Sequence, residues 1–370
     1  MTGPERTAAP ADAWLGLALV PGLLPSQAID LAALLCGPEN VVKAPQAVLR
    51  GAGIADDVAA AIGRAGVLAS AERAALDRIG GITITWDDDR YPARLRRIAN
   101  PPLALMVRGS IEAIDDPAVA IVGARRAGEY GRRIADELAR GLAQAGITVV
   151  SGLAAGVDAA AHRGALAAGG RTIAVMATGI DRVYPAWNRC LADQIAGRGA
   201  LVTEFPWGTP PLHFHFPRRN RIISGASVGT VVVEAAERSG SLITAHYALE
   251  QGREVFAVPG PVGVPQHAGC HRLIQQGARL VTSVEDVLAE IAPALVGRVR
   301  AARAAAAAAS VTAAEHELLV AIGDGAAHLD DVVARAGMDA GAALEVLLAL
   351  ELRDLVEQRP GMRFVRRQVA

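Results

Sequence analysis

The sequence of 370 residues is poor in lysine, in cysteine and in aromatic side chains. Lys43 is its single lysine, yet 37 lysine and arginine residues together oppose 38 acidic ones, for a formal charge of −1. Almost every cation is therefore an arginine, whose planar guanidinium matches the geometry of carboxylates and phosphates. In a chain so close to neutral, a cluster of arginines is a local feature that needs its own explanation.

Long hydrophobic runs are also missing. Cys36, Cys190 and Cys270 lie far apart and form no Cys-x-x-Cys pair, which suits a reducing compartment. The polar, proline-bearing start lacks the charge and the apolar core of a signal peptide, and no apolar run approaches the length of a membrane span. We therefore expect a cytoplasmic protein without a membrane partner.

Residues 11–80 are rich in alanine and leucine at helical spacing, interrupted by the turn sequences VPGLLP and GAGIAD. This pattern predicts a small helical module of the SAM or helix-hairpin-helix type. A helix-hairpin-helix would hold DNA phosphates on glycine amides, but Leu23 and Leu24 stand where such hairpins usually return to glycine. A module that only packs against the rest of the protein is the alternative.

The end of the chain predicts another module. Residues 293–311 form a linker of alanine and arginine, low in complexity. Residues 312–370 follow as three helices and a hairpin that turns at Pro360-Gly361, the order of a winged helix. Its third helix, within residues 336–352, has no basic residue. We therefore expect a packing or partner surface there rather than a helix that reads the DNA major groove.

Between residues 85 and 292, short strands alternate with helices. The strand sequences are AVAIVGA (118–124), ITVVSG (147–152), RTIAVMA (171–177), ALVTEF (200–205), GTVVVEA (229–235) and EVFAVPG (254–260). Apolar, β-branched runs of this kind are typical of strands buried on both faces. The alternation predicts an α/β fold with a doubly wound, mostly parallel sheet. In the first helix, Tyr130, Ile134, Leu138 and Leu142 recur every four residues, which predicts that this stripe faces the sheet.

Polar turns follow several of these strands. In open α/β sheets, ligands bind beyond the carboxyl ends of the strands. A Ser-Gly-Ser sequence after the fifth strand would precede a helix, where free amides and the helix dipole favour an anion. Ordinary helix capping is the alternative for each turn alone, but together the turns predict a phosphate-bearing ligand. The candidate residues at this edge are Arg125, Ser151, Gly152, Ser239, Gly240 and Ser241.

The sequence FHFPRRNRIISG, residues 214–225, joins aromatic rings to a cluster of arginines. It follows the fourth strand, and Pro217 predicts the first turn of a helix. Cations that hold phosphates, next to rings that stack on bases, are what single-stranded nucleic acid requires. The alternative is a solvated turn whose arginines pair with carboxylates such as Glu204 or Glu234. The candidate residues here are Phe216, Arg218, Arg219, Asn220 and Arg221.

Six segments together resemble the DNA-processing protein A family (DprA or Smf). They are YPARLRRIANPPLALMVRG (91–109), AIVGARRAGEYG, VVSGLAAGVDAAAH (149–162), FPRRNRIISG, VVVEAAERSGSLITAHYALEQGREVFAVPG (231–260) and GCHRLIQQGA (269–278). The resemblance spans residues 85–292, with the segments in order and at natural spacing. It implies an extended Rossmann-like domain that binds single-stranded DNA, loads the RecA recombinase onto it in DNA uptake and recombination, and forms a homodimer. We expect neither an enzyme activity nor a cofactor.

The resemblance also implies roles for single residues. Carried over by position, Arg125 would hold a backbone phosphate and Phe216 would stack on a base. His213 stands where relatives often have a lysine that contacts DNA, and a neutral imidazole is a weaker phosphate partner at pH 7. Gly128 stands where a small hydroxyl residue is common, and we expect Arg218 and its neighbouring arginine to compensate in part.

Other classes of protein fit less of the sequence. Phosphoribohydrolases of the lysine-decarboxylase-like group share a GT…E pattern with GTVVVEA, but they carry a PGGxGT turn where this chain has GASVGT (225–230). A dinucleotide-dependent oxidoreductase needs G-x-G-x-x-G, and the glycines of GARRAGEYG (123–131) are spaced differently. His267, Cys270 and His271 are close in sequence but lack a fourth zinc ligand at suitable spacing, so we expect no metal.

Overall fold

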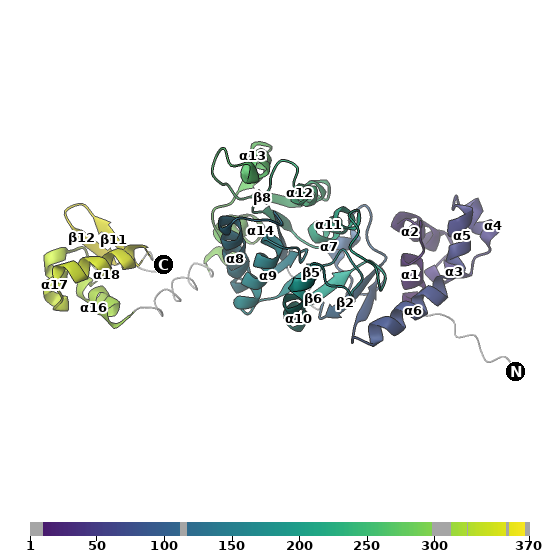
Figure 1. Cartoon of the computed structure of the whole chain (residues 1–370), viewed down its shortest axis with the longest axis horizontal. Coiled ribbons are helices and arrows are strands. Elements are labelled where there is room, and N and C mark those ends of the chain that lie inside the picture. The colour runs from purple at the N-terminus through teal and green to yellow at the C-terminus, as the bar shows by residue number, and fades with distance from the viewer. Residues whose placement is uncertain (1–9, 112–116, 298–311, 324, 353–354, 367–370) are drawn as a thin grey trace. The chain divides into compact units, whose positions relative to one another are not determined.

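The computed structural model describes residues 10–111, 117–297, 312–323, 325–352 and 355–366. The chain divides into two compact units, Met1–Ile291 and Ala292–Ala370 (Figure 1). Each unit is described by itself below.

The first unit begins with short helices, as the alanine- and leucine-rich sequence predicts. They are α1 (Pro10–Ala18), α2 (Pro25–Leu34), α3 (Pro38–Lys43), α4 (Gln46–Gly51), α5 (Asp56–Ile62) and α6 (Ala65–Asp77). Proline occupies the first turn of α2 and of α3, where its missing N–H costs no hydrogen bond. Trp14, Leu17, Leu31, Leu49 and Ile62 form the apolar core of this helical module.

The sheet has the doubly wound topology that the sequence predicts. Its strands are β1 (Ile82–Thr85), β2 (Ala104–Gly109), β3 (Ala118–Val122), β4 (Thr148–Ser151), β5 (Thr172–Val175), β6 (Ala200–Thr203), β7 (Gly229–Val232), β8 (Glu254–Ala257) and β9 (Arg279–Leu280). Their order is β1-β2-β6-β5-β4-β3-β7-β8-β9. The ladder from β6 to β9 is parallel, whereas β1 and β2 extend the sheet as antiparallel strands. The six predicted strands are all present; β1, β2 and β9 are additional.

Helices cover both faces of the sheet. They are α7 (Ala93–Arg96), α8 (Glu129–Gln144), α9 (Val157–Ala167), α10 (Arg189–Arg198), α11 (His215–Gly225), α12 (Ser241–Glu250), α13 (Ala268–Gln275) and α14 (Val284–Ile291). On one face, Ile222 of α11 and Ala245 of α12 pack in the same core as Val107 of β2. On the other, Leu191 of α10 packs with Met106 of the same strand. Alternate strand residues thus serve two separate cores.

The predicted stripe of α8 is only half correct. Leu138 and Leu142 are buried, but Tyr130 is 36 % exposed, and its hydroxyl donates to the carbonyl of Pro259 at 2.9 Å. The buried face includes Gly131 and Ala135 instead. A strict four-residue spacing drifts around a helix of 3.6 residues per turn, so the first residue of the stripe leaves the core.

The helical module and the sheet share a core. Leu15 of α1 and Leu76 of α6 pack with Met106 and Leu201 of the sheet. The carboxylate of Glu72, also on α6, accepts the backbone N–H of Trp207 at 3.0 Å. The module is therefore continuous with the α/β domain within one compact unit.

The second unit confirms the predicted winged helix. Its elements are α16 (Ala313–Ile322), β10 (Ala327–His328), α17 (Leu329–Ala336), α18 (Ala340–Leu352), β11 (Val356–Arg359) and β12 (Arg363–Arg366), with the strand order β10-β12-β11. The hairpin turns at Gly361, whose φ of +81° suits glycine. Of the predicted linker 293–311, the first residues form a short 3₁₀ helix, Pro293–Leu295, and residues 298–311 lie outside the described residues.

Among the described residues, no helix combines the length and the hydropathy that crossing a bilayer requires.

Candidate functional site

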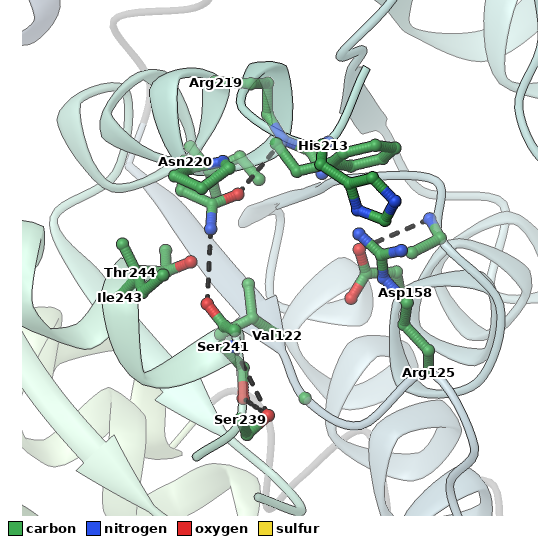
Figure 2. Close-up of a pocket in the computed structure, with 16 residues that line it drawn as sticks. Val122, Arg125, Asp158, His213, Arg219, Asn220, Ser239, Ser241, Ile243 and Thr244 are labelled. Carbon is green, nitrogen blue, oxygen red and sulfur yellow. Dashed lines mark hydrogen bonds between the residues drawn. The ribbon is translucent and has the colours of Figure 1, made fainter. Parts of the chain in front are cut away.

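A pocket of about 270 Å³ opens at the carboxyl edge of the parallel strands. Val122 ends β3 there, and the chain passes from β3 to β4 on one side of the sheet while β7 lies on the other. This is the topological switch point at which open α/β sheets bind ligands. Eight of the twelve predicted site residues line it (Figure 2): Arg125, His213, Phe216, Arg219, Asn220, Ser239, Gly240 and Ser241.

Arg125 and Phe216 are stacked at one side of the pocket. The guanidinium of Arg125 lies 4.3 Å from the centroid of the Phe216 ring, within the range of a cation–π contact. Arg125 is exposed and Phe216 is half-buried. Phe216 meets a further ring, Tyr184, edge to face at 5.8 Å. A cation and an accessible aromatic ring are therefore held together at the mouth of the pocket.

Two helices begin at this pocket. α12 begins at Ser241, directly after Gly240, as the sequence predicts. The hydroxyls of Ser239 and Ser241 lie 2.8 Å apart. α11 begins at His215, two residues before the predicted start at Pro217. Two helices thus begin at the same pocket, and their positive dipole ends favour an anion there.

Arg219 has a different environment from Arg125. It is 3 % exposed, and its Nη1 donates to the carbonyls of Gly152, at 2.7 Å, and of Val175. Burial lowers the pKa of Arg219 to about 10, and the nearby Asp158 opposes that shift. Arg219 therefore remains a cation at neutral pH, and its Nε and Nη1 donate to protein acceptors.

Asp158 is a site residue that the sequence reading missed. It lies in the first turn of α9 and accepts the backbone N–H groups of Gly152, at 3.1 Å, and Ala154, at 3.4 Å. Burial raises the pKa of Asp158, and Arg219 and Arg125 oppose the shift. The signal was present in SGLAAGVD, because an acidic residue in a first helical turn is a common partner of exposed amides.

Arg218 and Arg221 lie outside the lining and share a carboxylate. Oε2 of Glu204 accepts from Arg218 Nη2 at 3.1 Å and from Arg221 Nη2 at 2.5 Å. Arg221 and Glu204 are buried, whereas Arg218 is exposed. The alternative of arginines paired with Glu204 thus describes these two residues. Glu234 instead accepts the backbone N–H of Gly128, at 3.2 Å.

The remaining predicted residues are Ser151, Gly152 and His213. Ser151 is buried, and its hydroxyl donates to the carbonyl of Ile121 at 2.6 Å. A Cβ at Gly152 would overlap the Arg219 guanidinium, which would have to shift. His213 is exposed and lines the pocket, as does Arg125.

In the described part of the chain, no three side chains of histidine, cysteine, aspartate or glutamate converge as metal ligands. Nε2 of His271 lies 3.0 Å from the carbonyl of Gly260, and burial raises the pKa of the Cys270 thiol to about 12.

The fold defines a Rossmann-like α/β protein with a pocket at the carboxyl edge of its sheet, followed in the chain by a winged helix. The chain belongs to the DNA recombination-mediator protein A family, whose model matches residues 82–292. The model of the DprA winged helix domain matches residues 302–362. The family resemblance read from the sequence is therefore confirmed.

Individual relatives and solved structures of the same family are also similar to this chain. Protein Smf of Escherichia coli is 43% identical over 282 residues, 75% of each chain. DNA processing protein DprA of Streptococcus pneumoniae is 47% identical over 203 residues, 55% of this chain and 72% of that protein. The X-ray structure of the pneumococcal protein superposes with a TM-score of 0.66 at 35% identity, covering 77% of this chain and 98% of that one. DNA processing protein A of Helicobacter pylori, studied for its single-stranded DNA binding mode, matches with a TM-score of 0.52 at 27% identity, over 57% of this chain and 95% of that one.

Proposed function

We propose that this protein binds single-stranded DNA at the carboxyl edge of its sheet. The observation that carries the proposal is the Arg125–Phe216 stack, with a centroid distance of 4.3 Å, at a pocket where two helices begin. The guanidinium and the positive ends of the two helices suit a phosphate, and the ring suits a base. The H. pylori relative, described for its binding of single-stranded DNA, supports the same ligand class.

The pocket residues fall into two groups, those that would contact DNA and those that would hold the contacting groups in place. We propose that Arg125, Ser239, Gly240 and Ser241 contact backbone phosphate, because they combine an exposed cation with serine hydroxyls at the positive end of α12. Phe216 is proposed to stack on a base, and His213 to flank it. Arg219, Asn220, Ser151 and Gly152 would act as the support that holds these groups in place, since their hydrogen bonds are directed at the protein.

We further propose that the bound DNA is handed to a recombinase of the RecA type, and that the protein acts as a homodimer in DNA uptake and recombination, as a binding protein rather than an enzyme. Membership of a recombination-mediator family supports this role. Strand exchange by RecA on DNA coated with single-strand-binding protein should start sooner when this protein is added, and light scattering should give twice the chain mass.

The proposal is tested with labelled oligonucleotides of equal length, single- or double-stranded, over a salt series. We expect single-stranded DNA to bind well above duplex. The logarithm of its affinity should fall with the logarithm of salt concentration by about 0.7 per phosphate contacted. Equal affinity for duplex, or single-strand affinity that salt leaves unchanged, contradicts the proposal.

A further inference from the structure

A loop next to the pocket carries two aromatic side chains between two arginines. Residues 182–189 read RVYPAWNR. Tyr184 is 46 % exposed and Trp187 is 78 % exposed, whereas Trp14 is buried and Trp86 and Trp207 are half-buried. Indole is the largest apolar side chain, and exposed aromatic groups of this kind mark interaction surfaces.

The loop is firmly anchored. The Asn188 side-chain amide donates to the carbonyl of Leu153 at 2.9 Å, and the Thr178 hydroxyl donates to the carbonyl of Arg182 at 2.5 Å. At its start, Asp181 accepts the backbone N–H of Gly208 at 2.8 Å. Because these hydrogen bonds fix the conformation of the loop, we infer that Trp187 is exposed as part of an ordered surface.

The aromatic side chains continue the candidate site. Tyr184 touches Phe216 edge to face at 5.8 Å, and Phe216 in turn carries the Arg125 guanidinium. Trp187 lies three residues beyond Tyr184, in the short 3₁₀ helix Ala186–Asn188. Exposed Arg182 and Arg189 flank the two rings. Rings flanked by cations suit a single strand, which offers both bases and phosphates.

We propose that Tyr184 and Trp187 form a second base-stacking platform, which extends the DNA track beyond the Arg125–Phe216 pocket. Arg189, which begins α10 and has no ion pair among the described residues, would hold a phosphate of this second segment. The inference rests on the proposed single-stranded DNA binding, and it adds residues outside the pocket lining.

Tryptophan fluorescence tests the contact directly. Saturating dT20 should quench the emission of the native protein, and Trp187→Phe should remove most of that quenching while it keeps most of the affinity. Unchanged emission of the native protein at saturating dT20 overturns the inference.

Affinity as a function of length tests the extension. Trp187→Ala should weaken binding of dT20 by about 5- to 150-fold, the range for one base–aromatic stack. The ratio of native to variant affinity should shrink as the oligonucleotide shortens toward the pocket alone. Arg189→Ala should make the salt dependence shallower by about 0.7, whereas Trp187→Ala should not alter it. Val67→Ala, another exposed apolar truncation on α6, is the matched control and should change nothing.

The outcomes separate this inference from the proposed function. If native protein binds dT20 and Phe216→Ala weakens it, but Trp187→Ala binds within twofold of native at every length, the platform does not exist and the pocket stands. A loss that is equal at all lengths, or dissociation of a dimer without loss of affinity per chain, also overturns the platform. If native protein does not bind dT20, the proposed function fails first.

Discussion

Arg125 is exposed on a phenyl ring, whereas Arg219 is buried and bonded to main-chain carbonyls. Both are guanidinium groups at the same pocket, but Nε and Nη1 of Arg219 donate to protein acceptors, whereas Arg125 is exposed. Burial of Arg219 beside Asp158 instead holds the ends of β4 and β5 together through the Gly152 and Val175 carbonyls. At the scale of the residue, exposure separates a ligand contact from a structural support.

Substitution of the two stacked residues should separate base contact from phosphate contact. Phe216→Ala should cost about 1–3 kcal/mol of single-stranded DNA binding and leave the salt dependence unchanged. Arg125→Ala should weaken binding and make the salt dependence shallower by about 0.7, because one fewer phosphate is neutralised. Fluorescence anisotropy over a salt series measures both, and thermal melts by circular dichroism provide the control. If Phe216→Ala melts earlier but binds normally while folded, the ring belongs to the core and not to the site.

His162 makes stability depend on pH. It is fully buried, and its Nδ1 lies 2.7 Å from the Thr172 hydroxyl, which itself donates to the carbonyl of Val149. Nδ1 must therefore carry the proton, and Nε2 is buried without a partner. Burial, together with the positive charge of Arg219 and Arg163, lowers the pKa of His162 to about 3.

Since the folded pKa lies below the unfolded value of about 6.5, the unfolded chain binds the extra proton. The contribution is complete above pH 6.5 and is lost as the pH falls toward 3. Within that window the free energy of unfolding should fall about 1.4 kcal/mol per pH unit more steeply than in His162→Gln, whose amide can still donate to Thr172. Urea titrations at pH 7, 6 and 5 test this, and parallel slopes for the two proteins would contradict it.

At the scale of the element, α11 begins at the pocket, but two of its arginines form ion pairs within the protein. Arg218 and Arg221, three residues apart, lie on the same side of the helix and meet Glu204, just beyond β6. Glu204 thereby ties α11 to the sheet edge. The buried partner, Arg221, depends on that carboxylate, whereas the exposed Arg218 is also solvated.

Glu204→Gln should therefore lower the free energy of unfolding by about 3–5 kcal/mol, because it leaves a buried guanidinium without its counter-charge. Arg218→Ala, which removes only the exposed partner, should cost about 1 kcal/mol or less. Urea denaturation followed by circular dichroism compares the two. Equal losses would show that Glu204 does not anchor α11 through Arg221.

At the scale of the whole molecule, the winged helix forms a compact unit of its own. Its third helix, α18, exposes Leu344 and Leu348 and has no basic residue between its first and last positions, Ala340 and Leu352. Helices that read the major groove place basic or amide side chains there, so α18 lacks that chemistry.

Removal of residues 312–370 should therefore change the affinity for single-stranded DNA by less than about tenfold, or 1.4 kcal/mol. Oligonucleotide titration of the shortened chain measures this, with circular dichroism and light scattering to show that it is folded and assembled as before. A folded chain that loses most of its affinity would place the DNA site in the winged helix.

The sequence by itself determined the parallel strands, the winged helix, the start of α12 and the family. These features depend on local order: apolar runs, turn residues and helix starts are encoded within a few neighbouring positions. It did not single out β1, β2 and β9. β1 is a half-buried Ile-Thr-Ile-Thr run at one edge of the sheet, and β9 is a pair of exposed residues at the other, so neither shows the continuous apolar pattern of a central strand.

Only the tertiary structure decided what each arginine does. Arg219 contacts Gly152, which is 67 positions away in the sequence. Arg125 contacts Phe216, and the strands β4, β5 and β6 lie between these two residues in the sequence. The three arginines of RRNR have the same chemistry and lie within four residues. Arg219 is nevertheless buried against carbonyls, Arg221 is buried on a carboxylate, and Arg218 is exposed. Burial and pairing arise when distant segments pack together, and a guanidinium can bind a ligand only where that packing leaves its donors free.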